Sequence, residues 1–500
     1  MAHTSSNHIH QLIRSMNRSE KRFFKIHLRT HSSKHSDSYM DLFDRISQQD
    51  EYEEASLIKE FKSSGQRYPV MKHRLFEKVL DALEVFHRGH DPILALRTEL
   101  NRAQVLMSRG LYAQADQLIE GVILKAAELD LPELILEAKR LQLVFLGPDL
   151  KGSGQDSKTL TDWSVEMDAL ISQVKDEWDL CHKRAIVFRQ METVSRGPET
   201  SDIEGLASYA NHMTEKGPRC RFIWHHGMAA LAFMHGNAHE TLEHTNACVR
   251  LLEEHGFMTK DHKVSLAKMV ANGFYSAYRS HDLDQAEEFM VRLKIMYKEE
   301  AESPEYPEFL ALYLQSKLFM ENHSHSYFDA EHMREMEQRF LEICEALSTQ
   351  VRAGLDYGFA LFNHGVHDSS AALKALNRIL HAADVSRDDE VYARALIYSN
   401  VIHIETDDRE WLLHSARTLK RYLQSRDRMG ATESALLRYI ADIRRSRSVD
   451  GEAKALARYT ESLRTVRRLP MERISFEYFD FLRWAEERSS LNRRSPRMVA

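Results

Sequence analysis

The chain has 500 residues, of which 43% are hydrophobic and 29% are charged, as expected for a folded, water-soluble protein. It contains only 19 glycines and 10 prolines, and this scarcity of helix breakers favours long helices. No apolar run approaches the roughly 18 residues that a membrane-spanning helix needs. The first residues also lack the apolar segment of a secretory signal. We therefore expect a cytoplasmic protein that does not enter a membrane.

Cysteine usage and charge distribution bear on the state of the thiols and on the kind of partner the chain could attract. Four cysteines without a C-x-x-C pair are too few for a disulfide framework, so we expect free thiols. The net charge of −7 conceals balances of +6 in residues 1–36 and +9 in residues 417–500, which leave −22 for residues 37–416. Basic ends on an acidic body can steer acidic partners to either end, but charge alone specifies neither a fold nor a ligand.

Residues 1–90 form an expected helical N-terminal region that differs from the rest of the chain. Ser19 is a candidate N-cap for its second helix, and Tyr68-Pro69 marks the turn before its last helix. Apolar periodicity predicts five helices, over residues 8–16, 20–30, 39–48, 53–63 and 70–88.

From residue 94 onward, turn-forming residues recur at an almost constant interval. They lie at Gly110, Gly152, Gly197, Gly236, His281-Asp282, Asn322-His323, Gly365, Asp407-Asp408 and Asp450-Gly451. Successive markers are about 42 residues apart, and each interval has room for two helices. The clearest predicted pairs are 219–235 with 238–255, 261–280 with 282–301, and 349–363 with 368–382. No strand alternation or β-hairpin signal occurs, so the array is expected to be all-α.

Stacked hairpins bury the apolar stripe that each hairpin alone would leave exposed, and the stack becomes a solenoid. We expect this solenoid over residues 91–488. Its last helix, predicted over residues 471–488, carries five aromatic side chains in a stripe that is more typical of a capping helix than of a ligand site. Residues 489–500 are expected to be a disordered tail.

Residues 94–470 resemble the tetratricopeptide-repeat superfamily in its longer-helix form. The resemblance is clearest where Ala103, Gly110, Tyr112 and Ala115 occupy the small and aromatic packing positions of such a hairpin. It implies a right-handed α-solenoid of antiparallel helical hairpins. The period departs from the usual 34 residues, which leaves a HEAT-like or other helical-hairpin solenoid open. The N-terminal block, LIRSMNRSEKRFFKIHL and YMDLFDRISQQDEYEEASLIKEF, resembles the start of large bacterial helical-repeat proteins and implies no functional residue.

Two patterns suggest nucleotide or metal binding, and each has a simpler structural interpretation. The loop over residues 152–159 is close to a phosphate-binding loop, but Ser157 replaces its second glycine and no strand precedes it. His244 and Cys248 have helical spacing that suits a metal, but His239 is rotated away from them and further ligands are missing. No nucleophile motif occurs. We therefore expect no enzyme activity, no metal and no cofactor.

The resemblance implies that the first helix of each hairpin lines a concave groove. The inward positions would then lie two, three, six, ten and thirteen residues before the turn. Applied to the turns at Gly110, Gly236, His281 and Gly365, this rule gives candidate partner contacts. They are Arg97, Gln104, His226, Lys268, Tyr275, Tyr278, Arg279, Arg352 and Asn363. The apolar residues at the remaining positions are assigned to the hairpin core. Aromatic side chains beside polar ones suit an extended peptide or a partner helix.

These observations predict a non-catalytic scaffold or adaptor that binds a protein or peptide in the groove. One alternative is a peptide-sensing transcriptional regulator whose residues 1–90 contact DNA. Another is a nucleotide-binding protein or enzyme that uses the 152–159 loop. Arginine clusters at 444–447, 464–468 and 493–494 are candidates for phosphate contacts, although an acidic body repels a polyanion. The identity of the partner, the pathway and the oligomeric state stay open.

Overall fold

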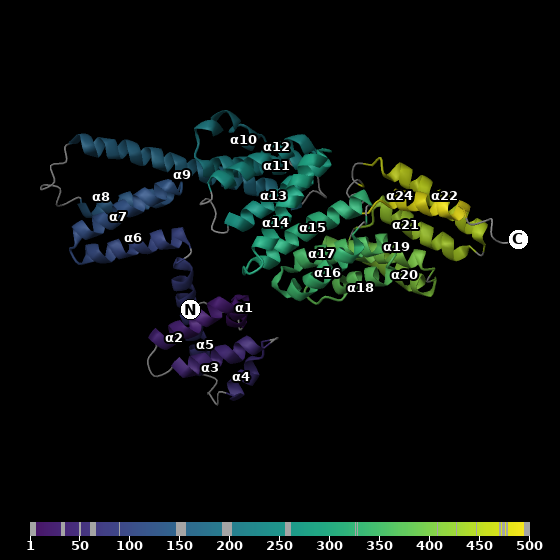
Figure 1. Cartoon of the computed structure of the whole chain (residues 1–500), viewed down its shortest axis with the longest axis horizontal. Helices are drawn as coiled ribbons and strands as arrows, with labels where there is room; N and C mark the ends of the chain where they lie inside the picture. Colours follow the sequence, from purple (N-terminus) through teal and green to yellow (C-terminus); the bar gives the residue numbers. More distant parts are fainter. Residues whose placement is uncertain are drawn as a thin grey trace. The chain divides into compact units, whose positions relative to one another are not determined.

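The structure is a computed structural model, and over the part of the chain that it describes the fold is all-α, as predicted (Figure 1). The described residues are 7–31, 36–49, 52–60, 67–89, 91–146, 157–192, 203–255, 262–325, 327, 329–407, 409–426, 428–446, 448–469, 472, 476 and 479–494. These residues form 23 α-helices and two short 3-10 helices, without a strand. None of these helices is both long and apolar enough to cross a membrane.

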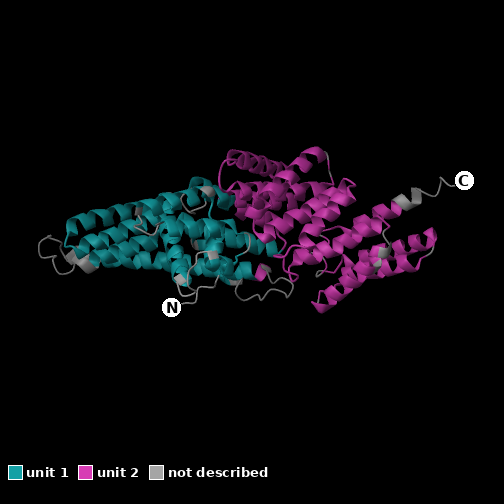
Figure 2. Ribbon diagram, turned by 90° about the horizontal axis from the view of Figure 1, so that it is seen from below, with its two compact units in different colours: residues 1–189, 200–235, 246–265 teal, residues 190–199, 236–245, 266–500 magenta. Residues whose placement is uncertain are grey.

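Two compact units divide the chain (Figure 2). Unit 1 comprises residues 1–189, 200–235 and 246–265, and unit 2 comprises residues 190–199, 236–245 and 266–500.

The five N-terminal helices of unit 1 all exist. They are α1 (His8–Ser15), α2 (Arg18–His31), α3 (Ser36–Gln48), α4 (Glu54–Glu60) and α5 (Arg67–Arg88). Their core buries Ile13, Phe24, Phe43 and Tyr68 almost completely. The predicted cap at Ser19 is wrong. Asn17 accepts from the Glu20 backbone N at 2.9 Å, and Glu20 accepts from the Asn17 backbone N at 2.8 Å. This reciprocal pair starts the helix two residues earlier than predicted.

Unit 1 continues through a first hairpin to a single long helix. Its elements are α6 (Pro92–Ser108), α7 (Tyr112–Glu128), α8 (Pro132–Leu146), α9 (Ser157–Glu192), α10 (Ile203–Ala207), the 3-10 helix η3 (Ala210–Glu215) and α11 (Pro218–Met234). Ala103 and Ala115 meet in the core of α6 and α7 with no exposed surface, whereas Tyr112 is 43% exposed. The expected helix pair between Gly152 and Gly197 is wrong. The 36 residues of α9 contain no Gly or Pro, so nothing interrupts the helix.

The remaining helices follow the chain in order, and α12 and the start of α13 are shared between the units. They are α12 (Ala238–Glu254), α13 (His262–Arg279), α14 (Leu283–Glu299), α15 (Tyr306–Ser324), α16 (Ala330–Ile343), η4 (Cys344–Ala346), α17 (Thr349–Gly365), α18 (Ser369–Leu380), α19 (Glu390–Glu405), α20 (Arg409–Ser425), α21 (Ala431–Arg445), α22 (Val449–Val466) and α24 (Phe481–Arg494). Most consecutive helices of unit 2 from α14 onward pack against each other, and the first helix α17 also contacts the first helices α15 and α19. The last helix begins ten residues later than predicted and continues to Arg494.

In most hairpins, the first helix ends at a residue with a positive φ, which is the left-handed conformation. These residues are Gly110 (φ 76°), Gly236 (φ 73°), His281 (φ 62°), His325 (φ 51°), His367 (φ 64°) and Asp407 (φ 55°). At His281, the following Asp282 donates its backbone N–H to the Ala277 carbonyl at 2.9 Å, which closes the helix end. Asp282 then caps α14 by accepting from the Gln285 backbone N at 3.1 Å. One pair of residues therefore ends one helix and starts the next.

At two of the predicted turn markers the helix continues further, and it ends instead at a later residue with a positive φ. The markers at Asn322-His323 and Gly365 both fall inside helices, because α15 continues to Ser324 and α17 to Gly365. The chain turns instead at His325 and His367. Histidine adopts the left-handed conformation more readily than most side chains do, so it replaces glycine here. The prediction failed because it gave priority to glycine and asparagine.

We predict that His281→Gly stabilises the protein. Glycine adopts a positive φ without steric cost, so the free energy of unfolding should rise by roughly 0.5–1 kcal/mol. Urea denaturation followed by circular dichroism measures the change. Lys294→Gly, in the middle of α14 on its exposed face, is the matched control and should lower the free energy of unfolding by about 1 kcal/mol. If both substitutions destabilise equally, the turn carries no conformational strain.

Candidate interaction surface

The candidate contacts in unit 1 lie in two different environments. Arg97 and Gln104 are exposed on α6, beside the row of buried core positions of that helix. His226 on α11 is half-buried, with its ring 5.0 Å from the ring of Phe188 and 5.7 Å from that of Phe222. Burial, with a smaller effect of Arg184, lowers the pKa of His226 to about 4. His226 is therefore a neutral packing residue at physiological pH.

In unit 2, the candidates on α13 surround a ring that belongs to α15. Tyr275 and Tyr278 are half-buried, and their rings lie 4.9 and 5.5 Å from that of Phe319. Lys268 and Arg279 are exposed on the same helix. Burial raises the pKa of Tyr275 to about 12, so this ring fixes α13 against α15, whereas Tyr278 presents part of its surface to solvent.

The candidates on α17 take part in internal contacts. Arg352 forms an ion pair with Asp384, which also accepts from Thr349 Oγ1 at 2.7 Å. Asn363 is 2% exposed, and its amide donates to Glu337 at 3.1 Å. Both side chains therefore hold α17 against neighbouring segments.

Arg378 extends this internal network beneath α17. Its guanidinium lies 2.8 Å from Glu337 and 2.5 Å from Asp356. Asp356 is 3% exposed, so its carboxylate depends on this partner.

The shifted turns change which residues share the position of Tyr275 and Tyr278. Counting two, three and six residues back from each left-handed residue gives one set per first helix. The sets are Arg279, Tyr278 and Tyr275 on α13; His323, Asn322 and Phe319 on α15; Gly365, His364 and Leu361 on α17; and Glu405, Ile404 and Val401 on α19. From these sets, the tyrosines, the phenylalanine, the two histidines and the carboxylate form what we call the inner band. It consists of Tyr275, Tyr278, Phe319, His323, His364 and Glu405.

The α13–α15 end of the inner band is aromatic. The rings of Phe319 and His323 stack with centroids 3.8 Å apart, and the Tyr278 ring lies 6.4 Å from that of His323. Phe319 is half-buried and His323 is exposed. Asn322, between them in the set, donates to the Gly358 carbonyl of α17 at 3.1 Å. This end therefore offers aromatic surface on a rigid base.

The α17–α19 end of the inner band is a chain of polar contacts. His364 Nδ1 lies 2.6 Å from the Tyr398 hydroxyl, and Nε2 lies 2.8 Å from Glu405 Oε2. The Trp484 indole of α24 donates to the other Glu405 oxygen. Burial alone would raise the pKa of Glu405, but His364, Trp484 and the charge of Arg488 outweigh it and lower the pKa. Glu405 is therefore held as an ionised acceptor.

Four of the six residues of the inner band were missed from sequence: Phe319, His323, His364 and Glu405. The signal that finds them is the left-handed preference of His325, His367 and Asp407, from which the correct register can be counted.

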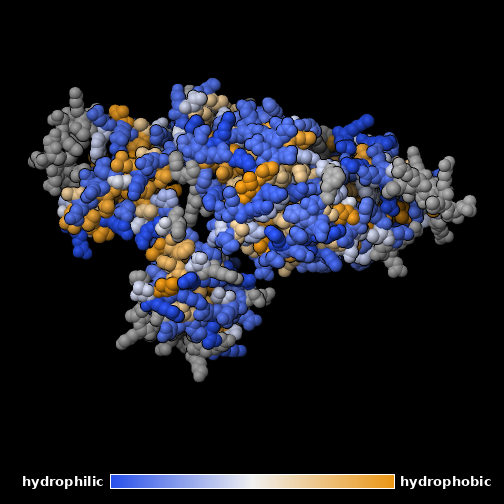
Figure 3. All heavy atoms as spheres, viewed as in Figure 1, coloured by the Kyte–Doolittle hydropathy of each residue, from blue (hydrophilic) through white to orange (hydrophobic). Residues whose placement is uncertain are grey.

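Hydrophobic side chains are also exposed outside the inner band. On the face shown in Figure 3, orange patches lie over α6, α7 and α8 of unit 1. The exposed large hydrophobic residues of these helices are Val105, Tyr112, Leu124 and Leu143. On α9, Trp178 is 68% exposed and stacks on His182 with the ring centroids 5.4 Å apart. In unit 2, the second helix α14 exposes Val291 and Ile295 by about half. Isolated exposed residues of this kind are common in soluble proteins.

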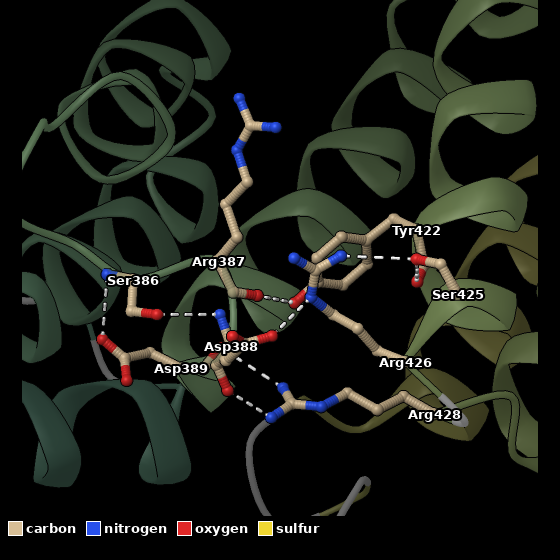
Figure 4. Close-up of polar contacts among 8 residues, drawn as sticks. All are labelled: Ser386, Arg387, Asp388, Asp389, Tyr422, Ser425, Arg426 and Arg428. Atoms are coloured by element: carbon tan, nitrogen blue, oxygen red, sulfur yellow. Dashed lines mark hydrogen bonds and ion pairs between the residues drawn. The ribbon is translucent and has the colours of Figure 1, made fainter.

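The basic residues near the C-terminus are partly used inside unit 2. Figure 4 shows the segment before α19 attached to the end of α20. Arg426 lies 2.7 Å from Asp388 and over the Tyr422 ring, while Arg428 donates to the carbonyls of Asp388 and Asp389. The guanidinium of Arg387 points away from these contacts.

Among the arginines proposed for phosphate contacts, some form ion pairs within unit 2 and others are exposed. Arg464 pairs with Glu461 and Glu486, and Arg467 with Asp480. Arg444, Arg445 and Arg468 are exposed. Arg447 and the side chains of residues 493–494 lie outside the described part. Phosphate binding at these clusters stays a prediction.

Within the described residues, no three His, Cys, Asp or Glu side chains gather as a metal site would require. Cys248 is fully buried, and its thiol lies 3.9 Å from the Phe222 carbonyl. Burial, slightly opposed by Arg184, raises the pKa of this thiol well above its usual range. Of the 152–159 loop, residues 152–156 lie outside the described residues, and Ser157 begins α9.

Comparison of the chain with protein-family models, with curated proteins and with solved structures gives no significant match. A helical-hairpin fold hosts many functions. The function must therefore be argued from the inner band itself.

Asp356 and Asp384 should affect stability with opposite dependence on pH. Burial, only partly offset by Arg378, raises the pKa of Asp356 to about 6. Between its ordinary pKa of 3.8 and about 6, the folded state binds more protons, so this group lowers stability as the pH rises. Asp356→Asn should remove that decline. Urea midpoints between pH 4 and 7 measure it, and a decline equal to that of the wild type would contradict the assignment.

Asp384 is the matched control. Thr349 and Arg352 lower the pKa of Asp384, although its slight burial opposes them. Its contribution is therefore present above its ordinary pKa and is lost as the pH falls through the lowered folded pKa. Asp384→Asn should be less stable than the wild type at pH 7 and approach it in acid. Because Asp384 is largely exposed, we expect a small effect.

Proposed function

We propose that this chain is a non-catalytic scaffold or adaptor that holds a protein or peptide against the inner band. The observation that carries the proposal is the α13–α15 end of that band. There Tyr278 and Phe319 are half-buried and His323 is exposed, and ring contacts join α13 to α15. Rigid, partly exposed aromatic rings are the side chains that most often dominate the affinity of protein interfaces.

The spacing of the left-handed residues supports a tetratricopeptide-like repeat as the frame for this surface. Gly236, His281, His325, His367 and Asp407 follow one another at intervals of 45, 44, 42 and 40 residues. Nearly equal intervals bring equivalent side chains of successive first helices close to register. We propose a right-handed solenoid on this basis, with the first helices on its concave side.

The chemistry of the surface indicates what the partner presents. The rings of Tyr278 and Phe319 offer apolar contact, whereas the Tyr278 hydroxyl and the imidazole of His323 offer hydrogen bonds. The exposed cations Lys268 and Arg279 lie on the same helix as the tyrosines. An extended or helical segment with apolar anchors and an acidic flank complements this arrangement. Free cysteines and the absence of a membrane-spanning helix from the described residues fit a cytoplasmic role.

Substitution on the inner band should abolish partner capture. The double variant Tyr278→Ser, His323→Ser removes one ring and the stacked imidazole, and we expect at least a tenfold loss of captured partner. The measurement is affinity purification from a cell lysate with quantitative mass spectrometry. Circular dichroism melting must first show that the variant is folded.

The matched control alters an equal number of exposed side chains on the second helix α14. Val291→Ser with Ile295→Ser removes apolar surface away from the inner band and should leave the captured proteins unchanged. Retention of the same partners by the inner-band variant, or their loss from the α14 variant, would place the binding surface elsewhere.

A further inference from the structure

The second helix of the chain carries positively charged side chains on one face, which we call the cation row. It consists of Lys21, Arg22, Lys25 and Arg29 of α2. At 3.6 residues per turn, these four positions fall within an arc of about 100° around the helix. Phe24 and Leu28 lie outside this arc and are buried in the core of the N-terminal region, where α2 packs against α3 and α5 (Figure 1). The cation row stays at the surface, with its two arginines exposed and its two lysines half-buried.

Little of this positive charge is neutralised by the residues that the structure describes. Residues 7–31 contain six Lys or Arg and one Glu. That carboxylate, Glu20, takes part in the cap of α2 and lies 2.8 Å from His87 Nε2 of α5, so it serves the fold. Lys25 pairs with Asp44 of α3 at 2.6 Å. Among the described residues, no carboxylate pairs with the other three cations of the row.

The cations of the row also repel one another and a neighbour on α1. Partial burial, together with the charges of Arg14 and Lys25, lowers the pKa of Lys21. Repulsion of this kind raises the free energy of the unbound chain, and a bound polyanion relieves it. The cation row and Arg14 therefore form a surface whose charge an anionic partner complements.

The length of the cation row matches a short stretch of a DNA strand. Because a helix rises about 1.5 Å per residue, Lys21 and Arg29 are about 12 Å apart along the axis of α2. One strand of a DNA duplex carries a phosphate about every 3.4 Å along its axis, so this length corresponds to roughly three or four phosphates. Lysine and arginine are the side chains that most often contact phosphates. The number of cations in the row thus fits the number of charges it would meet.

A membrane surface fits this helix less well. A helix that lies on a membrane places its apolar face in the lipid and keeps its cations beside that face. Here the apolar side chains Phe24 and Leu28 are buried in the protein core, and Ile26 is the exposed large hydrophobic residue of α2. The cation row therefore has no apolar surface of that size to insert into lipid.

The side chains of α1 and α2 also favour duplex DNA over other nucleic acids. Single strands are bound largely by stacking of bases on exposed aromatic rings. Phe23 is half-buried, with its ring 5.3 Å from that of Phe86, and Phe24 is buried. Duplex RNA is recognised through its 2′-hydroxyls as well as its phosphates, whereas lysine and arginine are donors only.

The acidic balance of residues 37–416 does not prevent this contact. At physiological salt, charges more than about 8 Å apart are largely screened from each other. The N-terminal region also has a buried core of its own, which holds α2 in place. The local charge around the cation row, rather than the net charge of the chain, decides what binds there.

We propose that the cation row, extended by Arg14, binds the phosphate backbone of double-stranded DNA without reading its base sequence. This activity is additional to the proposed function. The cation row lies in unit 1, whereas Tyr278 and Phe319 of the inner band lie in unit 2. A chain with both surfaces would bring the partner of the inner band to DNA.

The test measures binding of the full-length chain to a fluorescein-labelled DNA duplex of about 20 base pairs and random sequence, by fluorescence anisotropy at about 50 mM salt. The variant Arg22→Glu, Arg29→Glu should bind at least tenfold more weakly than the wild type. For the wild type, log K should fall with log salt with a slope of about −3 to −4, and the slope of the variant should be smaller by about 2. The milder variant Arg22→Gln, Arg29→Gln should show the same direction, and circular dichroism melting checks that both variants fold.

The matched control is Lys59→Glu with Arg74→Glu, which reverses two exposed cations of α4 and α5 in the same region. It should bind the duplex as the wild type does. Equal losses in both charge-reversal variants would overturn the proposal, because net charge alone would then explain binding. Absence of wild-type binding, or tighter binding to phosphatidylserine vesicles, to duplex RNA or to a polyglutamate peptide, would also overturn it. The variant Tyr278→Ser, His323→Ser should bind the duplex normally, so this proposal and the proposed function can fail separately.

Discussion

The positive φ of one residue at the end of each first helix is the constraint on which the surface depends. His281, His325 and His367 each stop a helix at a fixed point, and the side chains one, two and three turns earlier are thereby assigned to core or solvent. A shift of two residues, from Gly365 to His367, replaces Asn363 and Phe362 by Gly365 and His364 at the matching positions. The turn therefore determines which side chains a partner can meet.

Most helices could be predicted from the sequence, because apolar periodicity and the scarcity of Gly and Pro are local properties of each segment. The pairs α13–α14 and α17–α18 were predicted to within two residues at each end. The failures at α9 and at Ser19 have local causes too, which the choice of turn and cap residues overlooked. Absence of a breaker let α9 run through an expected turn, and Asn17 with Glu20 displaced the cap from Ser19. The handedness and the repeat period stay proposals, since neither follows from local propensity.

The candidate site was harder to predict than the fold, because a surface position requires the correct phase within one or two residues. Tyr275 and Tyr278 were found since the turn at His281 was located correctly. Arg352 and Asn363 were chosen from a turn placed two residues early, and both side chains make internal contacts. Contacts between distant segments, such as that of Trp484 with Glu405, have no signal in a single sequence.

Glu405 connects the fold to the proposed activity. The Glu405 side chain is 31% exposed, and His364 supplies a donor to one of its oxygens from within the array. The second donor is the Trp484 indole of α24, whose neighbours Phe481, Leu482 and Ala485 are buried in the same core as residues of α17 to α22. The chain itself therefore closes the Glu405 end of the inner band. The α13–α15 end, where Tyr278 and Phe319 are half-buried and His323 is exposed, is the part that is left for a partner.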